Sequence, residues 1–477
     1  MATPLKTSNY LKDASREYSI YVNRTRHFPS FADGLKDAMR KALHVMKSKG
    51  RIKTAALAGA MTEQLLYVHG DASGSINSLA APFGNNIPLL KAEGNFGTRL
   101  APTAYSASRY TEVEKPSYAS SLIYTDYDII PTEPNFDGST HQPVALLSVL
   151  PLLLINGMNG TGVGWSSMIL PRKPEEVVNA VIAALEGKPI PKLTPHFNWC
   201  DAKVTSNGIH ESGGSSWEFT GCVEVKDTST LLITELPPLM DIEDFRERLN
   251  GFEEKDKILS YEDDSSHSIN LTIKLKRGTA KDWTSTDAVQ FLNLRQAKTE
   301  NFVVVSWDGT GIIHYAYDEK TGKDAVTQYI EDWVKWRFGW YTKRYQKFID
   351  DDNYELNQLR AIKACFEAKL PEQARKLLDK SAIKVAISDI VKLARLIALN
   401  DEQLGYIADL PLHRWTTSSY DSIVDKIKEL EARLAENKKI LASDSLRTGI
   451  FIKEATDLKD VMKKAVAEIT ATRNPKG

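Results

Sequence analysis

The chain has 477 residues, which is long enough for about three domains. Its composition, 42% hydrophobic and 26% charged, is that of an ordinary globular protein. The formal net charge of -1 excludes a histone-like polycation, although a local basic face remains compatible with it.

Cysteine usage and hydropathy exclude several further classes. The three cysteines form no Cys-x-x-Cys pair, so neither a zinc site nor a disulfide framework is expected. Residues 1–11 lack the apolar core of a signal peptide. The longest apolar run, Val144–Ile155, is interrupted by Ser148 and Pro151, and a bilayer span needs about 20 residues. We therefore expect this run to be buried core and expect no membrane association.

Two amphipathic helices are predicted near the N-terminus, over 34–47 and 54–67, with a break at Gly50–Arg51. This is a helix-turn-helix pattern, which is equally typical of a helical hairpin without a DNA role. From Val22 to Lys53, basic residues outnumber acids, because only Asp33 and Asp37 oppose nine cations. The nine cations are Arg24, Arg26, Lys36, Arg40, Lys41, Lys47, Lys49, Arg51 and Lys53. This local excess favours contacts with DNA phosphates.

The middle of the chain predicts an α+β region. The glycine-rich segment 156–164 lacks both the Gly-Lys-Ser/Thr ending of a phosphate loop and dinucleotide-site spacing. It is therefore interpreted as a turn that brings backbone close to another group. Strands are predicted over 231–237 and 268–275, with a short helix over 241–249 between them.

The last third is predicted to be helical. An aromatic-rich helix begins near Ile330, and a later segment carries apolar residues at heptad spacing, with Asn437 at the skipped position. The heptad residues are Ile423, Ile427, Leu430, Leu434 and Leu441. The two segments are expected to pair as antiparallel coiled-coil arms, with a small helical cap over 383–410. An intramolecular helical bundle without a gate role is the alternative.

The most informative pattern is a tyrosine beside an arginine. Arg109 and Tyr110 follow the glycine-rich turn Gly94–Gly97, with His69 upstream. A tyrosine phenol can attack a DNA phosphate and hold the broken strand as a phosphotyrosine. A neighbouring guanidinium can stabilise the charge that develops on that phosphate. The pattern therefore indicates DNA breakage and rejoining.

The sequence resembles the type IIA DNA topoisomerases, specifically their breakage-reunion, gyrase A-like part. The resemblance extends from about Arg24 to Leu441, and its motifs follow the family order. The matching segments are Arg26–Lys36, His69–Asp71, Gly94–Gly97, Arg109–Glu112, Pro134–Gly138, Asn156–Trp165, Ile233–Pro237 and Leu410–Thr416. Gly164–Ser166 and the Tyr261–Asp263 region are more similar to the eukaryotic enzymes. The compact chain also resembles, within the family, the medium subunits of T4-type bacteriophage topoisomerases.

The resemblance implies a multidomain α+β fold. Residues 1–165 are expected to form an N-terminal arm and a winged-helix DNA-binding domain that carries the active-site tyrosine. Residues 166–326 are expected to form an α+β tower domain. Residues 327–477 are expected to form an antiparallel coiled coil that ends in a helical dimer gate.

The resemblance also implies roles for single residues. Tyr110 is the expected nucleophile, Arg109 stabilises the phosphate's transition-state charge, and His69 hydrogen-bonds phosphate oxygens. Tyr67 and Val68 stand where the family usually has a second upstream histidine.

DNA-contact positions of the family fall on Arg26, Lys36, Arg40 and, as an assisting cation, Lys41. Phosphate contacts of this kind carry little sequence information, so weakly selective cleavage is expected. Thr161 stands where the family commonly has an isoleucine that wedges between base pairs and bends DNA. Either bending is weaker here, or Met158 or Val163 supplies the wedge.

The implied function is that of a DNA cleavage and religation subunit in an ATP-dependent type II topoisomerase. It would act on double-stranded DNA as a homodimer, through a 5′-phosphotyrosine, in relaxation and decatenation. The chain shows neither the family's acidic Toprim metal signature nor an ATPase domain, so Mg²⁺ and ATP are expected on partner subunits. There is no room for a DNA-wrapping domain, so strong negative supercoiling is not expected. The expected location is the cytoplasm, in the nucleoid of a bacterial host if the chain is phage-encoded.

Two other functions compete with this interpretation. One is a non-catalytic, dimeric DNA-binding protein with a coiled coil. The other is a tyrosine recombinase, which we discount because none of the nine histidines has an arginine three residues later.

Overall fold

The structure is a computed structural model that describes residues 7–68, 70–266 and 268–473. It divides into two compact units. The first comprises the residues up to 337 together with those from 452 onward, and the second comprises residues 338–451. The division between these units falls after residues 337 and 451, whereas we predicted domain boundaries near 165 and 326. The three-domain division therefore stays a prediction.

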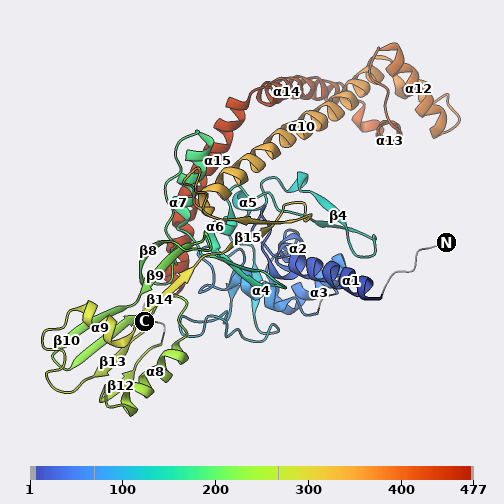
Figure 1. The fold of residues 1–477 in the computed structure, drawn as a ribbon. Helices are drawn as coiled ribbons and strands as arrows, with labels where there is room; N and C mark the ends of the chain where they lie inside the picture. Colours follow the sequence, from blue (N-terminus) through green and yellow to red (C-terminus); the bar gives the residue numbers. More distant parts are fainter. Residues whose placement is uncertain (1–6, 69, 267, 474–477) are drawn as a thin grey trace. The chain divides into compact units, whose positions relative to one another are not determined.

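The first unit begins with helices around a small sheet (Figure 1). Its elements are α1 (Thr7–Val22), the π-helix η1 (Asn23–His27), α2 (Asp37–Met46), β1 (Ile52–Lys53), α3 (Thr54–Leu65), α4 (Ser73–Ala80), β2 (Lys91–Glu93) and β3 (Glu112–Glu114). The helices predicted over 34–47 and 54–67 are confirmed as α2 and α3. β1 occupies the predicted turn between them because it pairs antiparallel with β3, which also pairs with β2.

The apolar run Val144–Ile155 is buried apart from the half-buried Val144, as predicted. It lies among α5 (Ala119–Leu122), η2 (Tyr127–Ile129), β4 (Thr132–Pro134), β5 (His141–Pro143), α6 (Leu152–Asn156), β6 (Met158–Thr161), β7 (Ser166–Ile169) and α7 (Pro174–Leu185). The glycine-rich segment forms the antiparallel β6–β7 hairpin. A Cβ on Gly160 would lie 1.9 Å from the His27 carbonyl oxygen. The predicted close approach of backbone therefore occurs, and its partner is η1.

The α+β region predicted from the strands is confirmed. Its elements are β8 (Lys203–Ile209), β9 (Ser215–Thr220), β10 (Cys222–Asp227), β11 (Thr230–Glu235), α8 (Ile242–Glu254), β12 (Ser260–Asp263), β13 (Leu271–Lys274), α9 (Ser285–Leu292), β14 (Arg295–Thr299), β15 (Phe302–Val305) and β16 (Ile312–Tyr315). A four-stranded sheet has the order β10-β11-β13-β12. α8 and α9 pack on it through Phe245 and Leu292, which share one apolar cluster with Ile233 and Ile273.

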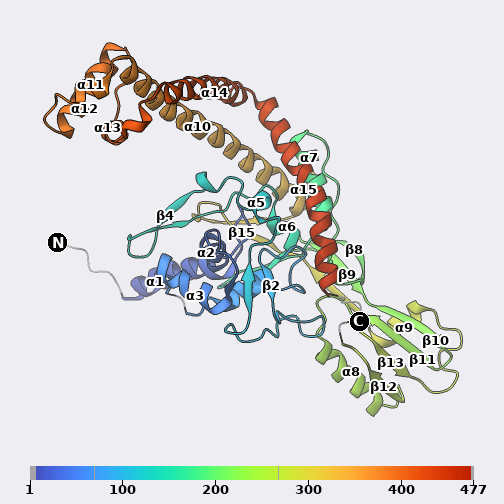
Figure 2. The ribbon, with the colours of Figure 1, turned by 180° about the vertical axis from the view of Figure 1, so that it is seen from behind.

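The second unit is helical, as predicted. It is built from α10 (Ala325–Glu367), α11 (Leu370–Ala374), α12 (Lys380–Leu393), α13 (Asp401–Ala408), η3 (Leu412–Arg414), α14 (Thr417–Leu441) and α15 (Asp444–Arg473), of which α10 and α15 continue into the first unit. α10 and α14 run side by side in both views (Figures 1 and 2). They are antiparallel, because Asp352 contacts Asn437 whereas Glu367 contacts Tyr420.

The skipped heptad position now has an explanation. Asn437 is buried, and its amide donates to the buried carboxylate of Asp352 at 3.0 Å, which Arg433 also contacts. A polar group at such a position fixes the register of a helix pair at some cost in stability.

Within the described residues, no helix combines the length and hydropathy that crossing a membrane requires.

Candidate functional site

Tyr110 lies at the end of a tight turn that leads directly into β3. Its backbone N–H donates to the Ala107 carbonyl at 2.8 Å, and its side chain is 68% exposed. The Arg109 guanidinium lies 4.5 Å from the centroid of the Tyr110 ring, within the range of a cation–π contact. The two predicted reactive side chains are therefore adjacent and open to a large substrate.

The N-terminus of α3 holds this turn. The first N–H groups of a helix have no partner within it. Here the N–H groups of Thr54 and Ala55 donate to the carbonyls of Thr111 and Ser108, at 3.0 and 3.1 Å. The hydroxyls of Thr54 and Thr111, both fully buried, hydrogen-bond each other at 2.8 Å. Tyr110 thus projects from backbone that is fixed on both of its sides.

The glycine-rich turn supports the same backbone from β2. Gly94 has a φ of +103°, and a Cβ there would lie 3.5 Å from the Thr111 side chain. Gly97 has a φ of +93°, and a Cβ would lie 2.3 Å from the Pro102 carbonyl oxygen. No side chain fits at Gly97 without moving backbone. The Asn95 carbonyl accepts from the Ser106 N–H at 3.1 Å, which closes the loop just before the tyrosine turn.

The tip of this loop is anchored in the α+β region, a feature that sequence reasoning missed. Arg99 is buried and contacts one carboxylate oxygen of Glu235 through Nε at 3.2 Å and Nη2 at 2.5 Å. Nη2 also donates to the Leu236 carbonyl at 3.2 Å. Leu100 packs against the apolar cluster of the four-stranded sheet. Glu235 lies in Ile233–Pro237, one of the segments that carry the family resemblance, and this was the only hint in the sequence. Nothing in the sequence identified Arg99 as the partner of Glu235.

Two of the predicted DNA contacts are largely buried in ion pairs. Arg40 is 7% exposed, and its guanidinium holds both oxygens of Asp33, at 2.7 and 3.0 Å. Asp33 also accepts the Leu146 N–H at 2.9 Å. Lys41 is buried with its Nζ 2.7 Å from Asp37. Arg40 therefore has a clear structural role, and DNA contact by either residue stays a prediction.

The other predicted cations are more accessible. Arg26 is exposed on η1, and its charge partly opposes the rise in the pKa of Tyr67 that burial causes. Lys36 is half-buried at the start of α2, and burial lowers its pKa. Contact of these two cations with DNA stays a prediction as well. His69 lies outside the described residues, so the structure does not place this predicted phosphate ligand.

Thr161 lies exposed at the end of β6, in a hairpin that also carries apolar side chains. Val163, at the hairpin tip, is 56% exposed. Its backbone is held by the Asn23 side chain, with hydrogen bonds at 2.9 and 3.1 Å. Met158 is half-buried and pairs with Ile169 in β7. The exposed Trp165 is a further candidate that the sequence analysis did not single out.

The described residues contain no group of three or more His, Cys, Asp or Glu side chains that could hold a metal ion.

Comparison with known proteins adds independent findings. Residues 26–456 match the sequence model of a family described as the A subunits of DNA gyrase and topoisomerase IV. DNA topoisomerase 2 of Candida albicans is 29% identical over 77% of this chain and 25% of its own length. The DNA gyrase A subunit of Mycobacterium tuberculosis is 26% identical over 96% of this chain and 56% of its own length. The chain thus spans only part of these relatives.

A similar fold occurs in a solved structure. The Plasmodium falciparum topoisomerase II DNA-binding, cleavage and re-ligation domain matches 94% of this chain, and 64% of that chain is covered. The TM-score is 0.77 at 22% identity, so the likeness concerns the fold.

Proposed function

We propose that the chain, which belongs to the family of DNA gyrase and topoisomerase IV A subunits, is the DNA cleavage and religation component of a type II topoisomerase. The observation that carries the proposal is the Tyr110 turn. It presents an exposed phenol and an adjacent guanidinium on fixed backbone, in the order that the family resemblance implies.

The proposed reaction is a reversible phosphoryl transfer. The phenol oxygen of Tyr110 attacks the phosphorus, loses its proton to solvent or a base, and forms a bond to the 5′-phosphate. The 3′ oxygen leaves and takes up a proton as the bond between it and phosphorus breaks. Religation is the reverse attack by that 3′ hydroxyl, so the energy of the broken bond is kept and resealing needs no ATP.

Cations of the chain stabilise this transfer in the proposal. Arg109 lies beside the phenol and can donate to the phosphate oxygens on which charge develops. Arg26 and Lys36 on η1 and α2, with Lys41 and His69, would hold the duplex by its phosphates. Val163 is our preferred wedge, since its exposed apolar side chain lies at the hairpin tip and the Asn23 side chain fixes its backbone.

Partner subunits complete the proposed enzyme. As the family resemblance implies, we assign Mg²⁺ to partner carboxylates, where it would act as a Lewis acid on the phosphate. We also assign ATP binding, and the gate movement that it drives, to a partner. Duplex passage, relaxation and decatenation are then the expected activities. The narrower kinship to phage medium subunits remains a proposal.

A Tyr110→Phe variant tests the proposal. It removes the nucleophilic oxygen but keeps the ring against Arg109, so DNA binding should persist while relaxation of supercoiled DNA falls below detection. The assay is gel electrophoresis of plasmid DNA with an ATPase- and Toprim-bearing partner, with Tyr105→Phe as the matched control. Unchanged relaxation by Tyr110→Phe would favour the non-catalytic DNA-binding alternative.

A further inference from the structure

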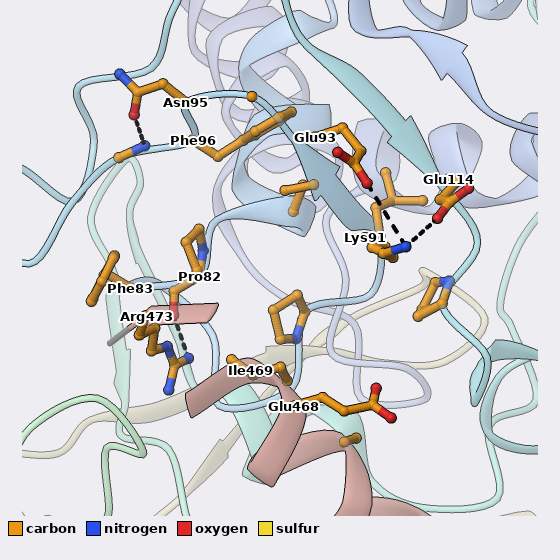
Figure 3. A pocket seen from close by; sticks show the side chains of 18 of the residues that line it. Pro82, Phe83, Lys91, Glu93, Asn95, Phe96, Glu114, Glu468, Ile469 and Arg473 are labelled. Atoms are coloured by element: carbon orange, nitrogen blue, oxygen red, sulfur yellow. Dashed lines mark hydrogen bonds and ion pairs between the residues drawn. The ribbon is translucent and has the colours of Figure 1, made fainter. Parts of the chain in front are cut away.

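A pocket of about 850 Å³ lies beside the loop that supports Tyr110 (Figure 3). β2 and Gly94–Gly97 contribute one side of it, and the last turns of α15, with Ile469 and Arg473, contribute another. The volume is in the range of small-molecule sites. None of the described residues to which we assign a DNA contact lines this pocket.

The pocket contains a buried cation with no counter-ion among the described residues. Arg473 is 5% exposed, and its Nη2 donates to the carbonyls of Pro82 and Asn85. Its Nε and Nη1 have no hydrogen-bond partner, and no carboxylate of the described residues forms an ion pair with it. Burial lowers the pKa of Arg473 to about 10. Burying an unpaired charge is costly, so this guanidinium is suited to an anion brought by a ligand.

The other cations at the pocket are already engaged. Lys91 pairs with Glu114 at 2.6 Å, Arg99 pairs with Glu235 at 2.5 Å, and the Lys115 ammonium donates to a backbone carbonyl at 2.5 Å. Among the described lining residues, Arg473 is therefore the cation with two buried nitrogens that have no hydrogen-bond partner.

Acidic side chains limit the charge that a ligand can carry. Glu93, Glu114 and Glu468 also line the pocket, and Glu468 points away from Arg473 (Figure 3). A ligand with several negative charges would meet these carboxylates, and like charges repel. The site therefore favours a single oxyanion group placed at the Arg473 end.

Much of the remaining lining is apolar and contains flat rings. The Phe83 ring lies 5.7 Å from the Arg473 guanidinium. The larger apolar lining residues include Pro82, Phe83, Pro88, Leu90, Phe96 and Ile469. Such a wall suits an aromatic ring system, which gains from burial and from ring contacts.

We propose that this pocket binds a small aromatic monoanion, with its carboxylate or sulfonate group paired to Arg473 and its rings on the apolar wall. The binding site goes beyond the proposed function and does not rest on it, because neither DNA nor Tyr110 takes part. Since Gly94–Gly97 belongs both to the pocket and to the support of the tyrosine turn, a ligand here would also touch the backbone behind the nucleophile.

Fluorescence titration of the full chain tests the proposal. The probe is anilinonaphthalene sulfonate, an aromatic monoanion, and its neutral counterpart phenylnaphthylamine has the same rings without the charge. We expect a saturable one-to-one site for the anion. Arg473→Gln should weaken it at least about tenfold, because a charge-assisted hydrogen bond is lost. The neutral probe should bind at least about tenfold more weakly than the anion.

Two further variants keep the result interpretable. Ala92→Trp, on β2, should fill the pocket and abolish the same site without touching Arg473. Arg360→Gln removes an exposed guanidinium from the second unit and should leave binding unchanged. Thermal unfolding checks that each variant is folded. Equal affinity of wild type and Arg473→Gln, equal affinity of the two probes, or no saturable site would each overturn the proposal.

Discussion

At the scale of single residues, the position of the Tyr110 backbone depends on a pair of buried threonines. Thr54 and Thr111 hydrogen-bond each other at 2.8 Å and connect the start of α3 to the residue after the tyrosine. Each hydroxyl is fully buried, so neither can exchange its partner for water. The position of Tyr110 is thus set by residues that are themselves fully buried.

Replacement of one threonine should cost more than replacement of both. Thr111→Val leaves the Thr54 hydroxyl without a partner, and we expect the free energy of unfolding to fall by about 1–3 kcal/mol. The double variant Thr54→Val/Thr111→Val removes both groups and should recover most of this loss. Urea denaturation measures the difference. A double variant less stable than the single one would show that the hydroxyl pair does not hold the turn.

Several of these residue roles were predictable from sequence and others were not. Tyr110 and Arg109 are neighbours in the chain, so their proximity follows from the sequence alone. The pairing of Arg40 with Asp33 was missed, because a basic excess does not reveal which cations are turned inward. Val163 was one of two open choices, and its exposure at the hairpin tip required the register of β6 and β7.

At the scale of elements, the loop between β2 and β3 connects the tyrosine turn to the α+β region. It begins and ends at the small sheet, and its tip is anchored by Arg99 and Leu100. Glu235 also accepts the backbone N–H of Leu236 at 2.9 Å and that of Asp201 at 3.3 Å. This buried carboxylate therefore organises two loops in addition to holding Arg99.

Removal of Arg99 should be strongly destabilising. Arg99→Ala leaves the Glu235 carboxylate buried without its cation, a change that typically costs about 3–5 kcal/mol. Arg51→Ala is the matched control, because its ion pair with Glu112 is exposed and should contribute little. Urea denaturation compares the two variants. Similar midpoints for Arg99→Ala and Arg51→Ala would contradict the anchoring role.

Elements were predicted better than their connections. Helical periodicity correctly indicated α2, α3 and α14, and alternation indicated β13, because both patterns are local. β1 was missed because a strand of two residues has no periodicity and exists only through its pairing with β3. The contact between Asn437 and Asp352 joins residues 85 positions apart, so no local pattern reports it.

At the scale of the whole molecule, the proposed enzyme is a homodimer joined through the tip of the second unit. Large apolar side chains are exposed there. They are Leu378, Val385, Leu393, Ile397, Tyr406 and Leu412. Burial against a second copy would remove this apolar area from water.

Charged substitutions at the tip should separate the dimer. Leu393 is 83% exposed at the end of α12, and Leu393→Asp should convert the dimer to a monomer at micromolar concentration. Ile209→Asp, an exposed aliphatic position on β8 in the first unit, should leave the dimer intact. Size-exclusion chromatography with light scattering gives the mass. A wild-type chain that is already monomeric under these conditions would contradict a dimer formed by this chain alone.

Covalent trapping tests the central claim most directly. The chain is mixed with supercoiled DNA, Mg²⁺ and an ATPase- and Toprim-bearing partner, denatured rapidly with detergent, and digested to map any peptide linked to DNA. Our account predicts a nucleotide on Tyr110, joined through a 5′-phosphate, and no adduct with Tyr110→Phe. An adduct on another residue would contradict the assignment of Tyr110 as the nucleophile. The absence of any adduct would contradict it as well, provided that the same partner is active when it is combined with a known cleavage subunit.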